Sequence, residues 1–258
     1  MFRLTKRRKF ILSSLLLTLG LGFLAFGRFA NRYLAIAVWS ALCIPLYLWS
    51  LLEGLVGWIW LLVWILPVFF TLGVGLFYFL LPTSLLTAIP IILLYFLGIY
   101  ALFLSENIFT VASQRTIQLY RSASAIVYLL TLFTCFLLYD TVFSFRLPFW
   151  GNFGWVLVIS FFLFLHFVWT VELEEKVSKK VFKFAFVLAL ILAEMALALS
   201  FWPSGIALSS LFLTAVAYVL LGLTQAEFAD RLFKNTIREY LIVGFGVFLI
   251  LLFYTSWG

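Results

Sequence analysis

Long apolar runs separated by short groups of charged residues define the pattern of this chain. No Asp, Glu, Lys or Arg occurs in residues 10–27, 33–52, 54–105, 122–139, 147–171, 195–226 and 240–258. A helix crosses the roughly 30 Å hydrocarbon core of a bilayer with about 20 residues. The run 54–105 would extend about 78 Å as one helix, so we expect it to turn at Leu81-Pro82-Thr83-Ser84, where Pro and Ser break the pattern.

Nine membrane-spanning helices are therefore predicted. The runs are continuously apolar and about twice as long as the alternating strands of a membrane barrel, so helices are the structure that satisfies the backbone internally. We predict an all-α, polytopic membrane protein whose residues 1–258 form a single transmembrane domain, with spans at about 10–27, 33–52, 55–81, 85–104, 122–143, 153–171, 181–201, 205–224 and 240–257.

The composition supports a membrane location. Hydrophobic residues make up 66% of the chain and charged residues 10%, whereas globular proteins average about 25% charged residues. So few charges would leave very large apolar patches facing water, which excludes a soluble protein. Cys43 and Cys135 fall inside predicted spans, so we expect small apolar fillers and no disulfide framework.

Basic residues predict the orientation, because Lys and Arg are retained on the cytoplasmic side. An N-in, C-out arrangement leaves only Arg28, Arg32 and Arg146 of the 17 basic residues outside. The net charge of +7 then reflects topology and attraction of the inner loops to anionic lipid, and nucleic acid is not an expected partner.

Three local features leave alternatives open. Arg7-Arg8-Lys9, an apolar run and Ala25-Phe26-Gly27 also resemble a signal peptide, although an 18-residue core favours an uncleaved helix. The segment 106–121 fits either an interfacial helix or a cytoplasmic extension of the fifth span. Pro45, Pro67 and Pro90 should kink spans two to four, either around a cavity or as tolerated bends.

Several short motifs in the second half of the chain point to relatives. They are Glu106-Asn107-Ile108-Phe109, Arg115-Thr116-Ile117-Gln118-Leu119, Leu147-Pro148-Phe149-Trp150, Glu172-Leu173-Glu174-Glu175, Ser200-Phe201-Trp202-Pro203, and Arg231-Leu232-Phe233-Lys234 before Arg238-Glu239-Tyr240-Leu241. Over about 105–255 the chain resembles a group of uncharacterised multi-pass membrane proteins of Patescibacteria. The resemblance implies a bacterial cytoplasmic (inner) membrane and no particular activity.

Glu194 is the clearest candidate for a functional group, because an ionisable side chain in hydrocarbon costs from about 3 to more than 10 kcal/mol. At about 100° per residue it points roughly 140° away from the centre of a small-residue stripe on its own helix, formed by Ala185, Ala189, Ala193, Ala196 and Ser200. Glu194 is thus either a proton- or cation-binding site, with Asp140 and Arg146 as possible companions, or a protonated side chain bonded to another helix.

His166, the only histidine, lies in span six with Trp169 and Thr170 at helical spacing. A neutral, hydrogen-bonded histidine is favoured over a proton-transfer group. Zinc sites need several ligands, so no metal site, cofactor or catalytic residue is predicted. The chain also has no Gly-x-Ser-x-Gly elbow and no Walker loop.

Three functions are compatible with the sequence, and the scarcity of polar groups inside the spans determines which of them is favoured. The favoured one is a non-enzymatic helical subunit or scaffold of a membrane assembly, with lipid and other membrane proteins as partners. The alternative is a permease or lipid and small-molecule transporter that uses Glu194 as its proton or cation site. The third is an intramembrane enzyme centred on His166 or Glu194.

Overall fold

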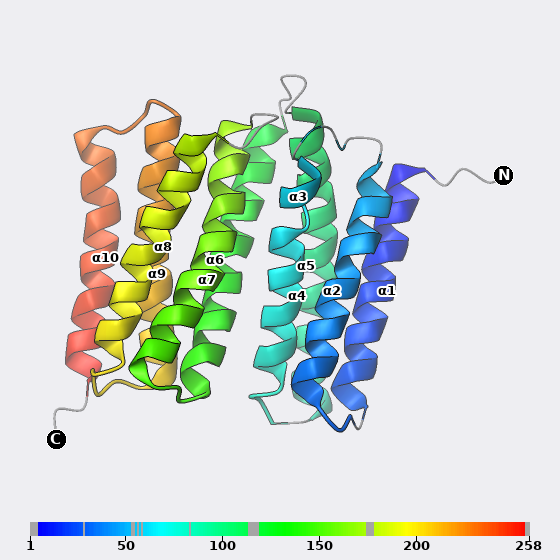
Figure 1. The fold of residues 1–258 in the computed structure, drawn as a ribbon, viewed down its shortest axis with the longest axis horizontal. Coiled ribbons are helices and arrows are strands. Elements are labelled where there is room, and N and C mark those ends of the chain that lie inside the picture. The colour runs from blue at the N-terminus through cyan, green and yellow to red at the C-terminus, as the bar shows by residue number, and fades with distance from the viewer. Residues whose placement is uncertain are drawn as a thin grey trace. The chain divides into compact units, whose positions relative to one another are not determined.

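The computed structural model describes residues 5–27, 29–52, 55, 57, 59–82, 84–112, 119–173 and 178–255. In these ranges every regular element is an α-helix (Figure 1), which confirms the all-α class. The described helices provide nine segments long and apolar enough to cross a membrane. The N-in, C-out orientation stays a prediction.

The spans correspond closely to the apolar runs. They are α1 (Lys6–Phe26), α2 (Arg32–Leu51), α3 (Ile59–Leu62) with α4 (Ile65–Tyr78), α5 (Leu85–Ala112), α6 (Tyr120–Ser144), α7 (Phe149–Glu172), α8 (Lys179–Leu199), α9 (Ile206–Phe228) and α10 (Lys234–Tyr254). Several helices extend past the apolar run into charged sequence, because a helix keeps its backbone hydrogen-bonded where it enters the polar interface.

The segment 106–121, predicted as an interfacial helix or an extension of the fifth span, lies partly in α5 and partly in α6. Residues 106–112 continue α5, the fourth span, beyond its apolar part and form no separate interfacial helix. Tyr120 and Arg121 begin α6, so this end of the segment does extend the fifth span. Residues 113–118 lie outside the described part of the chain. The continuation is consistent with the sequence, because Ile108 and Phe109 carry the apolar pattern of the fourth span past Glu106.

Packing divides the chain into two compact units. The first comprises Met1–Thr131 and Leu173–Lys176, and the second comprises Leu132–Glu172 and Val177–Gly258. Helix α6 thus contributes its first half to one unit and its second half to the other. The single transmembrane domain predicted from the sequence stays a prediction, and each unit is described by itself.

The prolines of the first unit have different effects. Pro67 lacks the N–H that would bond to the Val63 carbonyl, and the third span is interrupted just before it, between α3 and α4. Pro45 and Pro90 lie inside the continuous helices α2 and α5. Between these helices the side chains of Tyr47, Phe70 and Tyr95 are fully buried, so aromatic rings fill the space that the kinks could have opened.

The core of the first unit is an aromatic stack on α5. The Tyr47 ring from α2 lies 3.8 Å, centroid to centroid, from the Phe103 ring, at an interplanar angle of 10°. Phe10 from α1 stacks on the same Phe103 ring at 5.6 Å. Three helices therefore meet at one side chain, which places α1 and α2 against α5.

The core of the second unit is centred on the pair α7 and α8, which make the most extensive helix contact of that unit. The alanines of the α8 stripe, Ala185, Ala189, Ala193 and Ala196, are fully buried. Small side chains let helix backbones approach closely, so dispersion contacts along the whole helix stabilise the pair.

Helix α10 is the most peripheral helix of the second unit. It packs on α9 (Figure 1), and Leu251 is its buried residue. Contact with α9 is close at Gly222, where an added Cβ would collide with the Tyr240 ring. Most of α10 consequently presents apolar side chains outward.

The buried alanine stripe generates a stability prediction. Ala189→Leu should lower the free energy of unfolding by about 1–3 kcal/mol, because extra methyl groups overpack a tight helix contact. Ala198→Leu is the matched control, since Ala198 is exposed on the same helix, and it should leave stability nearly unchanged. Reversible unfolding in mixed micelles measures both, and equal losses would contradict the packing described for α8.

Candidate functional site

Glu194 lies on the outward side of α8. Its side chain is exposed, as is that of Met195, while Ala193 and Ala196 on the opposite side are buried. Exposed apolar neighbours surround it along the helix, including Phe186 and Val187. The position is about 8 Å from the end of α8 at Leu199, so the carboxyl lies within the membrane-spanning part of the helix and on its outer surface.

Asp140 is located near the end of α6 and is 8% exposed. Its carboxyl interacts with the Ser210 side chain of α9, and the Ser210 hydroxyl donates to the Ile206 carbonyl at 2.8 Å. Asp140 is therefore held within the packing of the second unit, whereas the Glu194 carboxyl faces outward.

Arg146 lies two residues beyond the end of α6 at Ser144. Its backbone adopts φ 49°, in the left-handed region, and its N–H donates to the Phe143 carbonyl at 3.1 Å, which closes the turn toward α7. The side chain is exposed. Arg146 therefore lies at the helix end, beyond the buried position of Asp140.

His166 is fully buried in α7. Its ring centroid lies 6.0 Å from that of Trp169, one helical turn away. Counted along α7 from Phe149, His166 is about 26 Å from the end of the unit that carries Arg146. Glu194 and Asp140 lie within about 8 Å of that same end, so the histidine is too far along the bundle to share a site with them.

Two polar contacts of the second unit join neighbouring helices. Tyr139 and Ser160 share a hydrogen bond of 2.8 Å between α6 and α7, and Asn152 donates through Nδ2 to the Ser200 hydroxyl at 3.0 Å. In the described residues no group of three or more His, Cys, Asp or Glu could hold a metal ion. The contacts of Tyr139 with Ser160 and of Asn152 with Ser200 support helix pairing, whereas other buried hydroxyls, such as that of Thr141, donate to a carbonyl of their own helix.

The first unit contains a polar cluster that the sequence analysis missed. The Thr71 hydroxyl lies 2.9 Å from the Tyr95 hydroxyl and 3.2 Å from the Cys43 sulfur, and it donates to the Pro67 carbonyl at 2.8 Å. The cluster joins α2, α4 and α5. Cys43 is thus buried as expected, and it takes part in a polar contact as well as filling space.

The burial of Glu106 was also missed, because the sequence pattern assigned residue 106 to a segment that is either interfacial or cytoplasmic. It is fully buried within α5 and is close enough to Tyr47 to interact with it electrostatically. The apolar residues Ile108 and Phe109 that follow it were the available signal.

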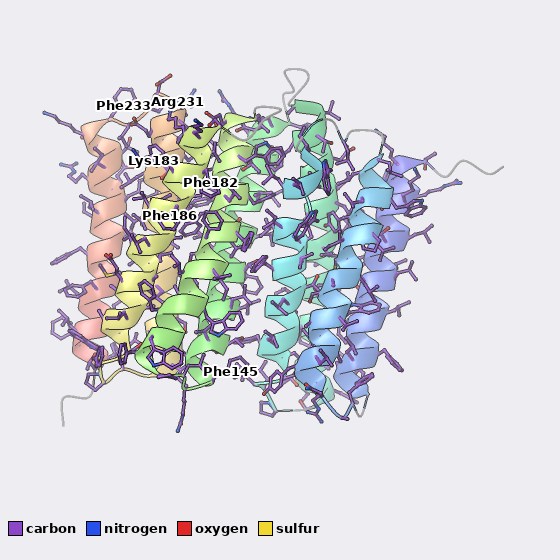
Figure 2. All side chains as sticks on the ribbon, viewed as in Figure 1. Phe145, Phe182, Lys183, Phe186, Arg231 and Phe233 are labelled. Carbon is purple, nitrogen blue, oxygen red and sulfur yellow. The ribbon has the colours of Figure 1, made fainter. Side chains whose placement is uncertain are left out.

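Charge is sorted between the two ends of the second unit. Lys183 and Arg231 lie at one end, and Phe145, which precedes Arg146, lies at the other (Figure 2). At the first end the Lys180 ammonium lies 4.2 Å from the centroid of the Phe228 ring, a cation–π contact between α8 and α9. The same end carries the beginning of α10 with Lys234 and Arg238.

Comparison with known families adds one match. Residues 50–254 match a family described as a protein of unknown function, DUF5656. The chain belongs to the DUF5656 family. The match covers the helices from the third span to α10, and therefore the whole second unit except its last residues. No curated protein matches the chain, and no solved structure matches it. Membership in DUF5656 assigns no activity, so the function must be argued from the geometry.

The buried pair in α6 and α7 of this DUF5656 protein yields a prediction. A double-mutant cycle with Tyr139→Phe and Ser160→Ala should give a coupling energy of about 0.6 kcal/mol and at most about 1.7, the range found for polar contacts between membrane helices. Unfolding free energies of the two single variants and the double variant supply the cycle. Strictly additive losses would show that the two hydroxyls do not stabilise the helix pair together.

Proposed function

We propose that this DUF5656 protein is a non-enzymatic helical subunit or scaffold of a membrane assembly in the bacterial cytoplasmic membrane. The observation that carries the proposal is the exposed Glu194 carboxyl on an apolar face of α8. An ionisable group in hydrocarbon is stabilised by a polar partner, a water-filled cavity or a proton. A polar group on a neighbouring membrane helix would supply the first of these.

The surroundings of Glu194 favour association with another chain. Val187 lies about 20° from Glu194 around the α8 axis and is exposed as well, so the two residues share one outward face. The small-residue stripe of α8 is buried within the unit. Association of α8 with another chain would therefore use this outward face.

A photoreactive phenylalanine analogue incorporated at Val187 tests whether this outward face contacts a partner. It should join the chain to one partner of defined mass in intact membranes, whereas the same analogue at Leu211, an exposed position on α9, should not. Glu194→Leu should lower recovery of that partner about ten-fold in mild detergent, since a polar contact between membrane helices contributes about 1–2 kcal/mol.

Met195→Leu is the matched control for Glu194→Leu, because Met195 is the exposed apolar neighbour of Glu194. Unchanged partner recovery with Glu194→Leu would contradict the proposal. Loss of solute or ion flux in reconstituted vesicles with Glu194→Gln, accompanied by normal partner recovery, would favour the transporter instead.

The proposed orientation is N-in and C-out. Its support in the second unit is that Lys179, Lys180, Lys183, Arg231, Lys234 and Arg238 gather at the end where α8 and α10 begin and α9 ends, which is the end expected in the cytoplasm.

Reporter fusions test this orientation. Alkaline phosphatase fused after Trp202 should be active, because the connection between α8 and α9 would be periplasmic, and the same enzyme fused after Arg231 should be inactive. A fluorescent protein that folds only in the cytoplasm should give the reverse pattern. Two active phosphatase fusions, or two inactive ones, would contradict the topology.

A further inference from the structure

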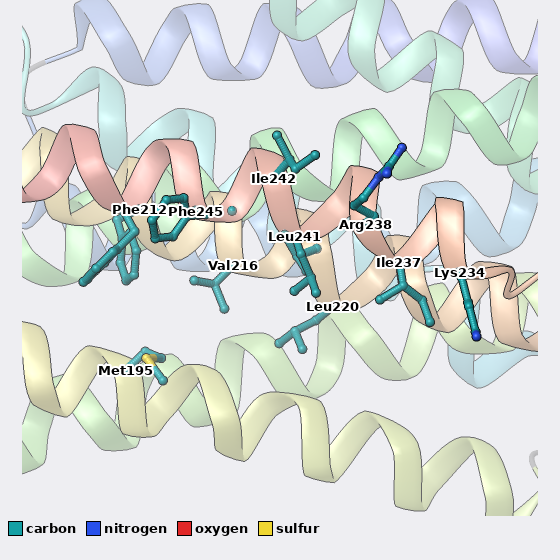
Figure 3. A pocket seen from close by; sticks show the side chains of 13 residues that line it. Met195, Phe212, Val216, Leu220, Lys234, Ile237, Arg238, Leu241, Ile242 and Phe245 are labelled. Atoms are coloured by element: carbon teal, nitrogen blue, oxygen red, sulfur yellow. The ribbon is translucent and has the colours of Figure 1, made fainter.

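The second unit has an open groove of about 870 Å³ between α8 and α10, with α9 as its floor. Figure 3 shows Met195 of α8 on one side, Leu241 and Phe245 of α10 on the other, and Val216 and Leu220 of α9 between them. The groove exists because α10 packs on α9 without wrapping toward α8.

One end of the groove is basic and the rest is apolar. Lys234 and Arg238 line it at the beginning of α10, and both side chains are exposed. They are four residues apart, so they lie on the same face of the helix. Every other side chain lining the groove is apolar. A ligand that fits this surface has an anionic end and a long hydrocarbon part.

The length of the apolar part equals the depth of one leaflet. From Arg238 to Phe248, the last lining residue of α10, the helix rises about 15 Å. Half of a hydrocarbon core of roughly 30 Å is also about 15 Å. A phosphate held at Lys234 and Arg238 would therefore place an acyl chain along the groove across the leaflet on that side.

We propose that this groove binds an anionic phospholipid, with the phosphate at Lys234 and Arg238 and one acyl chain along α10. The inner leaflet, where this end is expected, is the one rich in anionic lipid. A phospholipid fits better than a transmembrane helix, because it places an anionic group at Lys234 and Arg238 and an acyl chain along the apolar remainder of the groove. The proposal goes beyond the subunit function and uses neither Glu194 nor its partner.

Native mass spectrometry of the full chain in detergent tests the headgroup contact, with phosphatidylglycerol and phosphatidylcholine of identical acyl chains as probes. Phosphatidylglycerol should bind more tightly. The double variant Lys234→Gln, Arg238→Gln should weaken its binding about 30-fold, slightly more than five-fold for each charge. Arg231→Gln is the matched control, because Arg231 is exposed at the same end of the unit but does not line the groove.

Filling the groove tests the acyl-chain contact separately. Leu220→Trp should reduce binding of both lipids, because the indole would occupy the groove floor. Leu211→Trp, the same change at an exposed site of α9 outside the groove, should not. Thermal unfolding of each variant confirms that the fold persists.

Three results would overturn the lipid site. Equal affinity of the wild-type chain for the two lipids would remove the headgroup contact. An equal loss with Arg231→Gln would show a diffuse charge effect. A dimer mass that disappears with Leu220→Trp, without a change in lipid binding, would assign the groove to a second copy of the chain. None of these results bears on partner recovery through Glu194, so the two proposals fail independently.

Discussion

The structure depends on one constraint: inside hydrocarbon, each backbone N–H and C=O must be hydrogen-bonded within the protein. A chain with 66% hydrophobic residues is stable in a bilayer and not in water. Its continuously apolar spans are helices because a helix pairs all backbone groups within one segment. The interruption before Pro67 illustrates how local the exceptions are. The interruption is confined to Val63 and Trp64, because α3 ends at Leu62 and α4 begins at Ile65. The rest of the architecture follows from which helices pack against each other through their side chains.

Within the units, polar side chains make contacts between particular pairs of helices. Thr71 joins three helices through Tyr95 and Cys43, and Tyr139 joins α6 to α7 through Ser160. The hydrophobic effect does not drive membrane helices together, because lipid tails are as apolar as leucine side chains. Buried hydroxyl pairs therefore add specificity to contacts that alanine and aromatic packing stabilise.

The second unit differs from a closed bundle at its edge. The alanine stripe of α8 is fully buried, whereas α10 is held through α9 with Leu251 as its buried residue. The second unit thus presents two distinct outward surfaces. One is the outward face of α8 with Glu194, and the other is the groove that begins at Lys234 and Arg238. The first suits a polar partner helix and the second an anionic lipid.

The sequence by itself determined the class of the fold, the spans and the direction in which Glu194 points relative to the alanine stripe, because hydropathy and helical periodicity are properties of one segment at a time. Only the tertiary structure decided that Glu106 is buried, that aromatic rings fill the space beside Pro45 and Pro90, that His166 lies far from Asp140, and that a groove opens beside α10. Each of these depends on which segments distant in sequence pack together. In lipid that choice follows from side-chain shape and paired polar groups, which hydrophobicity along the chain does not encode.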